Sequence, residues 1–88
     1  MNSDFKSSFL RDIKKISNAD ILNAIERTIE EVEAARDLSL IKNIKKLAGY
    51  KNYYRIKIGA YRLGIVFDDN MVTFVRFLHR KDVYKFFP

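Results

Sequence analysis

The chain has 88 residues, no cysteine, one histidine and a formal net charge of +6 at pH 7. This length is below the roughly 100–150 residues of a typical domain, so we expect a single domain over residues 1–88 with one small core. The absence of cysteine excludes disulfides and cysteine-based metal sites, and one histidine excludes a zinc site built from several imidazoles. We expect no metal and no cofactor.

The positive charge is unevenly distributed along the chain. Residues 50–88 hold 8 Lys/Arg and 3 Asp/Glu, whereas residues 1–49 hold 9 and 8. This excess favours a polyanionic partner, with nucleic acid ahead of an anionic membrane surface. The N-terminus lacks the basic and apolar regions of a secretory signal, and no stretch approaches the ~18 apolar residues of a membrane span. We therefore expect a cytoplasmic protein without a membrane segment.

The first half of the chain predicts two helices, at residues 8–16 and 19–36. Apolar residues recur at helical spacing in both: Phe9, Leu10, Ile13 and Ile16 in the first, and Leu22, Ile25, Ile29 and Val32 in the second. Ser7 or Ser8 is the expected N-cap of the first helix, and Ser17-Asn18 separates the two and caps the second. The short connection predicts an antiparallel helical hairpin. Residues 36–50 are less regular and predict a short helical turn, and residues 1–5 are compatible with a brief edge strand.

The second half predicts three strands, near 53–58, 61–67 and 71–78, because apolar and polar residues alternate there. Gly59-Ala60 suits a type II′ hairpin turn, and Asp68-Asp69-Asn70 suits a second turn. Asp82 can cap a final helical turn. The expected fold class is α+β: an N-terminal helical hairpin packed on a small twisted antiparallel sheet, followed by a short C-terminal helical turn.

Cationic residues alternate with the apolar ones in these strands. Antiparallel pairing predicts that Arg55, Lys57, Arg62 and Arg76 share one sheet face, with Arg80 at its end, and Gly64 should leave a gap beside Arg62. Antiparallel sheets often have one solvated face, so a plain solvent-exposed surface is one interpretation. The other is a nucleic-acid surface, favoured by the absence of carboxylates among these positions. Tyr53 could stack on a base there, and Lys81 would add a further RNA contact.

Few catalytic arrangements are compatible with the sequence. It contains no candidate pair of catalytic carboxylates, no Ser-His-Asp order, no phosphate-binding glycine loop and no metal cluster. Cleavage of RNA needs none of these, since the substrate's own 2′-OH can attack the adjacent phosphate while Arg and Lys stabilise negative charge. A proton donor for the departing 5′ oxygen is also required, and Tyr84 or His79 could serve. Each of these two residues has an equally simple structural explanation.

Three motifs carry a resemblance to a known family. They are Arg55-Ile56-Lys57-Ile58-Gly59, Tyr61-Arg62-Leu63 and His79-Arg80-Lys81-Asp82-Val83-Tyr84, preceded by Phe9-Leu10-Arg11-Asp12-Ile13-Lys14-Lys15. In this order and spacing the chain resembles the RelE side of the RelE/ParE toxin superfamily. The resemblance implies a metal-independent ribonuclease toxin that cuts mRNA in the ribosomal A site and leaves a 2′,3′-cyclic phosphate.

The resemblance also implies partners and site residues. The partners are a cognate antitoxin, in a hetero-oligomer, together with the ribosome and mRNA. The antitoxin is expected to cover the basic face or to displace the C-terminal turn. The family's site residues correspond to Arg55, Lys57, Arg62, Arg80 and Tyr84.

One position departs from the family pattern. Arg55 stands where the best-known members have lysine, and arginine does not lose its proton in proteins. A base role would then fall to Lys57 or His79, unless Arg55 contributes charge alone. Two alternatives remain: a ParE-like toxin that poisons gyrase, and a non-catalytic basic RNA-binding module.

Overall fold

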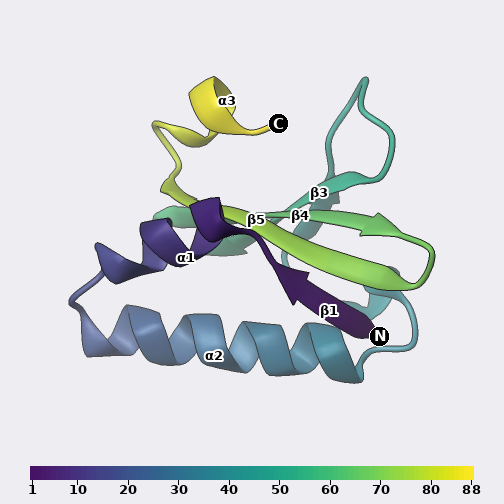
Figure 1. The fold of residues 1–88 in the computed structure, drawn as a ribbon, viewed down its shortest axis with the longest axis horizontal. Helices are drawn as coiled ribbons and strands as arrows, with labels where there is room; N and C mark the ends of the chain where they lie inside the picture. The colour runs from purple at the N-terminus through teal and green to yellow at the C-terminus, as the bar shows by residue number, and fades with distance from the viewer.

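The change from helical to alternating periodicity produces two layers, the two N-terminal helices below and a sheet above, with the short C-terminal helix on the other side of the sheet (Figure 1). The structure is a computed structural model that describes residues 1–88. The elements in order are β1 (Asn2–Phe5), α1 (Ser7–Lys14), α2 (Ala19–Ala34), a 3-10 turn (Leu38–Leu40), β2 (Ile44–Lys46), β3 (Tyr53–Ile58), β4 (Tyr61–Asp68), β5 (Met71–His79) and α3 (Val83–Phe86). The predicted α+β class, the helical hairpin, the three main strands and the final helical turn are confirmed.

The sheet has five strands in the order β1-β5-β4-β3-β2. The prediction of a purely antiparallel sheet is wrong, because β1 pairs with β5 in parallel, Asn2 opposite Met71. A parallel pair needs a crossover connection, and here the chain between β1 and β5 provides it. The predicted helical turn over residues 36–50 is also only partly correct, since it covers Leu38–Leu40 and the chain then forms β2 beside β3.

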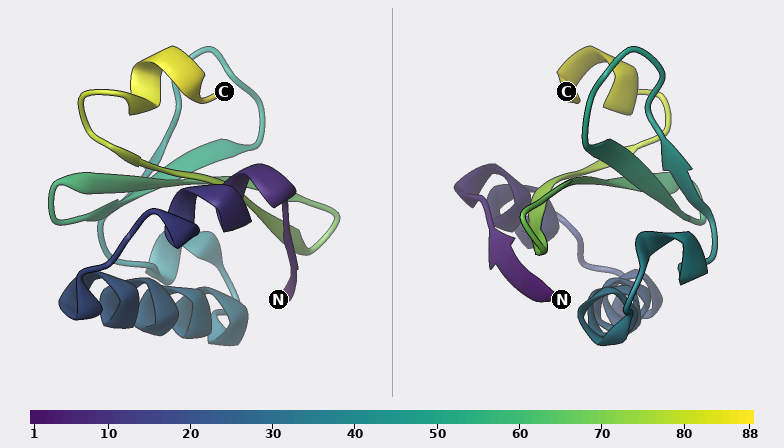
Figure 2. Two further views of the ribbon diagram at one scale, coloured as in Figure 1. Left: turned by 60° about the vertical axis from the view of Figure 1, so that its left-hand side comes forward. Right: turned by 90° about the vertical axis from the view of Figure 1, so that its right-hand side faces the viewer.

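The core lies between the sheet and the two N-terminal helices, which cover one face of the sheet (Figure 2). The helices contribute Phe9, Ile25 and Val32, and the strands contribute Leu63, Ile65, Val72, Phe74 and Phe77, all buried. No helix has the length and apolar character needed to cross a membrane. Asn18 caps α2 as predicted, accepting the N–H groups of Asp20 and Ile21.

The predicted serine N-cap of α1 is wrong, whereas the predicted N-cap of α3, Asp82, is confirmed in position only. Lys6 occupies the N-cap position of α1, because the hydroxyl of Ser8 donates instead to the carbonyl of Val75 in β5 (2.6 Å). Asp82 stands before α3 but makes no side-chain cap bond. The Ser8 hydroxyl therefore joins α1 to the sheet and does not cap the helix.

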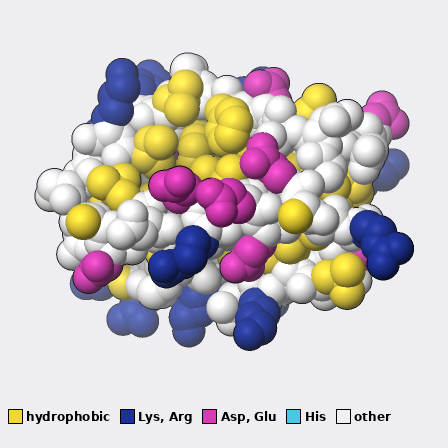
Figure 3. All heavy atoms as spheres, turned by 90° about the horizontal axis from the view of Figure 1, so that it is seen from below, with side chains coloured by type: hydrophobic (Ala, Val, Ile, Leu, Met, Phe, Trp, Pro, Cys, Tyr) yellow, Lys and Arg dark blue, Asp and Glu magenta, His cyan; other side chains and the backbone are white.

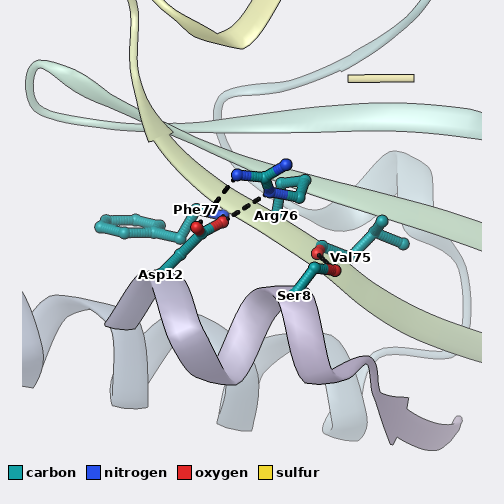
Figure 4. Close-up of polar contacts among 5 residues, drawn as sticks. All are labelled: Ser8, Asp12, Val75, Arg76 and Phe77. Carbon is teal, nitrogen blue, oxygen red and sulfur yellow. Dashed lines mark hydrogen bonds and ion pairs between the residues drawn. The ribbon is translucent and has the colours of Figure 1, made fainter. Parts of the chain in front are cut away.

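A bulge in β5 changes the predicted alternation of that strand. Ile65 pairs with Phe74 but Gly64 pairs with Arg76, so Val75 is an extra residue. Phe74 and Phe77 consequently both lie in the core, although strict alternation placed them on opposite faces. The bulge is held from α1: Ser8 binds the Val75 carbonyl, and Asp12 accepts the Phe77 N–H (2.9 Å) (Figure 4). Side chains of α1 thus hydrogen-bond to the backbone of β5 beyond the point where β1 stops pairing with it.

The charges separate between the two sides of the molecule. Seen from the helix side, several carboxylates lie near the middle of the face with one lysine or arginine beside them, and most other lysines and arginines lie towards the rim (Figure 3). The exposed glutamates of α2 are Glu26, Glu30, Glu31 and Glu33. A polyanion is repelled by such a surface. The opposite side of the sheet, under α3, is therefore the favourable approach for nucleic acid.

Candidate active site

The sheet face that carries α3 presents its side chains in rows fixed by the strand register. One row runs Lys45, Arg55, Gly64 and Arg76 across β2, β3, β4 and β5. The next row contains Lys57 opposite Arg62. The predicted clustering of Arg55, Lys57 and Arg62 on one face is therefore present, and Lys45 joins it.

Tyr84 of α3 lies against Arg55. The Arg55 guanidinium donates a hydrogen bond to the Tyr84 hydroxyl, and its central carbon lies 4.9 Å from the centre of the Tyr84 ring. The hydrogen bond from Arg55 lowers the pKa of Tyr84, with smaller contributions from the charges of Arg55, Lys45 and Arg62. The phenol is 70% exposed, so an incoming ligand can reach it. This tyrosine is more acidic than an ordinary one, which favours its deprotonated form.

Arg62 is held at the hairpin turn. Its Nη1 donates to the carbonyls of Gly59 (3.0 Å) and Tyr61 (2.9 Å). The turn itself requires Gly59, whose φ of +58° is left-handed, as the first position of a type II′ turn demands. The guanidinium therefore has a fixed place beside Lys57 and within electrostatic range of Tyr84.

The predicted gap at Gly64 is filled by the chain itself. A side-chain carbon added at Gly64 would lie 2.8 Å from the ring of Phe87, which follows α3 and is only 3% exposed. The absence of a side chain at residue 64 lets Phe87 sit flat on the sheet, between Arg55 and Arg76 in the row. The prediction of an open gap beside Arg62 is wrong, because the Phe87 ring occupies it.

Other predicted site residues lie elsewhere. His79 pairs with Tyr61 across the ladder, its ring edge-on to the Tyr61 ring at 5.6 Å, and its Nδ1 accepts the Lys81 N–H (3.1 Å). Tyr61 packs with the core, so His79 lies on the helix side of the sheet and away from Tyr84. Its contacts are those of a structural residue at the end of a strand.

Arg76 and Tyr53 are engaged in packing. Arg76 pairs with Asp12, its Nε donating to Oδ2 (2.7 Å) and its Nη2 to Oδ1 (3.1 Å), and it also lies 5.7 Å from the Phe86 ring. Tyr53 is packed between Tyr50 (6.0 Å between ring centres) and Phe87 (5.6 Å). The structure therefore places neither side chain as a free RNA contact.

Arg80 and Lys81 follow β5 and are exposed. The Arg80 N–H donates to the carbonyl of Ala60 (2.8 Å), which places this residue at the turn that also holds Arg62. Arg80 remains a predicted catalytic residue and Lys81 a predicted RNA contact.

The sequence did not identify three residues that lie at this site: Lys45, Tyr50 and Phe87. Lys45 belongs to a strand of three residues, Ile44–Lys46, which is too short to show alternation. The turn residues Gly49 and Asn52, both with positive φ, were the available signal for a hairpin loop before β3. No group of three or more His, Cys, Asp or Glu side chains is arranged to hold a metal ion.

The chain is similar in sequence and in structure to known toxins of toxin–antitoxin systems. The family model for the ParE toxin of type II toxin–antitoxin systems matches residues 4–84. Toxin RelE3 of Methanocaldococcus jannaschii is 41% identical over 85 residues, covering 96% of each chain. The toxin–antitoxin complex RelB-RelE from Methanococcus jannaschii contains a chain with a TM-score of 0.82 and 40% identity, covering 97% of this chain and 99% of that one. The YoeB dimer from Staphylococcus aureus shares the fold at 19% identity, with a TM-score of 0.75 over 91% of this chain and 97% of that one.

The class defined by the fold and these similarities is a small toxin with an α+β fold. Within that class the chain belongs to the RelE/ParE superfamily of type II toxin–antitoxin systems, as the sequence motifs predicted.

The pKa of Tyr84 gives a first test of the site. We expect Arg55→Met to raise it toward the ordinary value of about 10, because the hydrogen bond and the positive charge that favour the phenolate are removed. Titration of tyrosinate absorbance in the near ultraviolet measures this, and a Tyr84→Phe reference isolates one of the five tyrosines. Lys57→Met is the matched control, since it removes a charge from the same sheet face but keeps the hydrogen bond from Arg55 to Tyr84. Equal midpoints in wild type and Arg55→Met would contradict the site geometry.

Proposed function

We propose that the chain is a ribosome-dependent endoribonuclease toxin that cuts mRNA in the A site by attack of the 2′-OH on the adjacent phosphate. The observation that carries this proposal is the contact of Tyr84 with Arg55 on an open, cationic sheet face. A phenol with a lowered pKa beside several fixed cations supplies a base and charge stabilisation in one place.

Tyr84 acts as the general base in this proposal. Its phenolate form accepts the proton of the 2′-OH while the 2′ oxygen forms its bond to phosphorus. A lowered pKa makes a tyrosine a better base near neutral pH and a poorer acid. This reverses the proton-donor role that the sequence suggested for Tyr84, and the proposal gives no proton transfer to His79, which packs against Tyr61.

The arginines stabilise the charge that develops on the phosphate. Arg62 is held by two carbonyls at the turn, and Arg55 is held by Tyr84, so both are oriented before substrate arrives. The phosphorus–5′ oxygen bond then breaks, and the departing 5′ oxygen takes its proton from the ammonium of Lys57, opposite Arg62 in the register. The products are a 2′,3′-cyclic phosphate and a 5′-OH, and no metal takes part.

The charge distribution supports delivery of mRNA on the α3 side. The acidic face of α2 repels phosphates, while the exposed Arg80 and Lys81 follow β5 beside the turn that holds Arg62. These two side chains are proposed to bind the phosphate backbone of mRNA or ribosomal RNA.

The partner proposed for this toxin is a protein antitoxin that forms a hetero-oligomer with it. An acidic or amphipathic segment would complement the cationic face, and the exposed Tyr84 and Phe86 of α3 offer apolar surface to such a segment. It would act by covering the face or by displacing α3. Failure of every neighbouring reading frame to relieve growth arrest on co-expression would count against this partner.

Incubation with programmed ribosomes tests the activity. We expect cuts within the A-site codon and a 2′,3′-cyclic phosphate on the upstream fragment. An mRNA with a 2′-O-methyl group at the scissile nucleotide is the control, and it should resist cleavage because its nucleophile is blocked. The matching family model carries the ParE name, so DNA gyrase supercoiling is assayed alongside. Loss of supercoiling without mRNA cleavage would favour the gyrase-poisoning alternative, and RNA binding without either activity would favour a non-catalytic module.

A further inference from the structure

A hollow of about 330 Å³ lies next to the proposed catalytic residues. It is bordered by the β2–β3 loop and by the segment that follows α3. Its lining combines apolar Leu47 and Phe87 with two tyrosines, Tyr50 and Tyr84, and with cationic Lys45 and Arg55. Its volume is at the lower end of small-molecule sites, which are about 300–1,000 Å³. No step of the proposed reaction uses Tyr50 or Leu47.

The loop that contributes Tyr50 is held by hydrogen bonds and by contacts between aromatic rings. The Leu47 N–H donates to the Tyr53 carbonyl (2.9 Å), which closes the hairpin at its base. Gly49 supplies the left-handed turn, with a φ of +79°. The Tyr50 ring then rests against Tyr53, which in turn rests against Phe87. Tyr50 is nevertheless 51% exposed, so an aromatic surface remains open to a ligand.

The chemistry of the lining identifies the ligand. Aromatic rings bind nucleobases by stacking, and cations beside them bind the phosphates on either side of the base. An apolar protein side chain would use the aromatic rings but would give Lys45, Lys46 and Arg55 no counter-charge, and no Asp or Glu side chain lines the hollow. A single-stranded nucleotide satisfies both parts of the lining.

We propose that this hollow is a nucleobase subsite in which Tyr50 stacks on one base of the mRNA next to the scissile phosphate. The proposal rests on the proposed function, because Arg55 and Tyr84 line both the hollow and the reacting centre. Tyr50 is then a specificity residue: it determines which base is accepted at one position of the codon. It takes over the stacking role that the sequence assigned to Tyr53.

Two measurements test the subsite. The first is the affinity of the whole protein for short 2′-O-methyl RNA oligonucleotides, which bind but cannot be cut. The second is the base preference of cleavage on ribosomes programmed with mRNAs randomised around the A-site codon. The variants are Tyr50→Ala, Tyr50→Phe and the control Leu40→Ala, which removes an exposed side chain (69%) remote from the hollow. Circular dichroism melting confirms that each variant is folded.

We expect Tyr50→Ala to weaken oligonucleotide binding by about 5- to 150-fold, the range for loss of one stacked base, and to flatten the base preference at one nucleotide. Tyr50→Phe keeps the ring and should behave as wild type, as should Leu40→Ala. If the mRNA on ribosomes is never cut but Tyr50→Ala still weakens oligonucleotide binding, the subsite is supported and the proposed function is contradicted. If the mRNA is cut and Tyr50→Ala leaves both affinity and base preference unchanged, the subsite is overturned. It is overturned equally if Tyr50→Ala weakens only the binding of an antitoxin.

Discussion

Replacement of Arg62 by alanine is expected to lower the rate of mRNA cleavage by roughly 10²–10³, the usual effect of losing one charge-stabilising donor, or about 3–4 kcal/mol of barrier. In the proposed reaction the guanidinium would act on charge that exists only in the transition state, and such an interaction accelerates a reaction where uniform binding would not. Arg62→Lys should restore only part of the rate, because lysine cannot offer the same planar pair of donors. Single-turnover cleavage on programmed ribosomes measures the effect.

The fold should survive this change. Arg62 donates to two carbonyls at the turn, so its removal costs folding stability of about 1 kcal/mol, or about 4–8 °C in melting temperature for a domain of this size. Arg36→Ala is the control, since Arg36 is exposed, follows α2 and has no hydrogen bond or ion pair. Cleavage at the parental rate by Arg62→Ala would show that the cationic sheet face is not the active site.

The largest loss of folding stability is expected for Asp12→Ala. Asp12 is 6% exposed and accepts three hydrogen bonds, two from Arg76 and one from the Phe77 N–H. Removing one partner of a buried ion pair typically costs about 3–5 kcal/mol, because the other charge and the N–H are left without a partner. Small domains are stable by only about 5–15 kcal/mol. The melting temperature should therefore fall by at least about 12 °C.

Two further variants show whether the buried pair is the cause. Asp68→Ala removes an exposed aspartate that has no side-chain hydrogen bond or ion pair, and its effect should stay within about 0.5 kcal/mol. The double variant Asp12→Leu/Arg76→Met should recover part of the loss, since an apolar pair avoids the uncompensated charge. Thermal melting by circular dichroism resolves all three. Equal melting temperatures for Asp12→Ala and Asp68→Ala would contradict the assigned role.

The regular parts of the fold could be predicted because periodicity and turn chemistry act locally. The apolar stripe of α2, the cap at Asn18 and the turn at Gly59 are each encoded within a few residues. The parallel position of β1 and the bulge at Val75 are not encoded in this way. Both depend on contacts between residues far apart in the chain, such as Ser8 with Val75, that no local pattern contains.

In the candidate site, too, the features set by local sequence could be predicted and those set by long-range contacts could not. Alternation in β3 and β4 was sufficient to place Arg55, Lys57 and Arg62 on one face. It could not reveal that Phe87 covers Gly64, that Asp12 engages Arg76, or that Lys45 stands beside Arg55. The first two are tertiary contacts, and the third depends on a strand of three residues.

The position of β1 also has a consequence for the order in which the chain folds. The β3, β4 and β5 strands are joined by turns of two residues, so their pairing closes short loops and loses little chain entropy. By contrast, Asp12 and Arg76 are 64 positions apart, and β1 has no partner until β5 exists. Long-range contacts of this kind form slowly, so we expect the three-stranded meander to form first and the N-terminal segment to dock last. Because Arg76 also lies 5.7 Å from the Phe86 ring, we expect that late step to restrain further the helix that carries Tyr84.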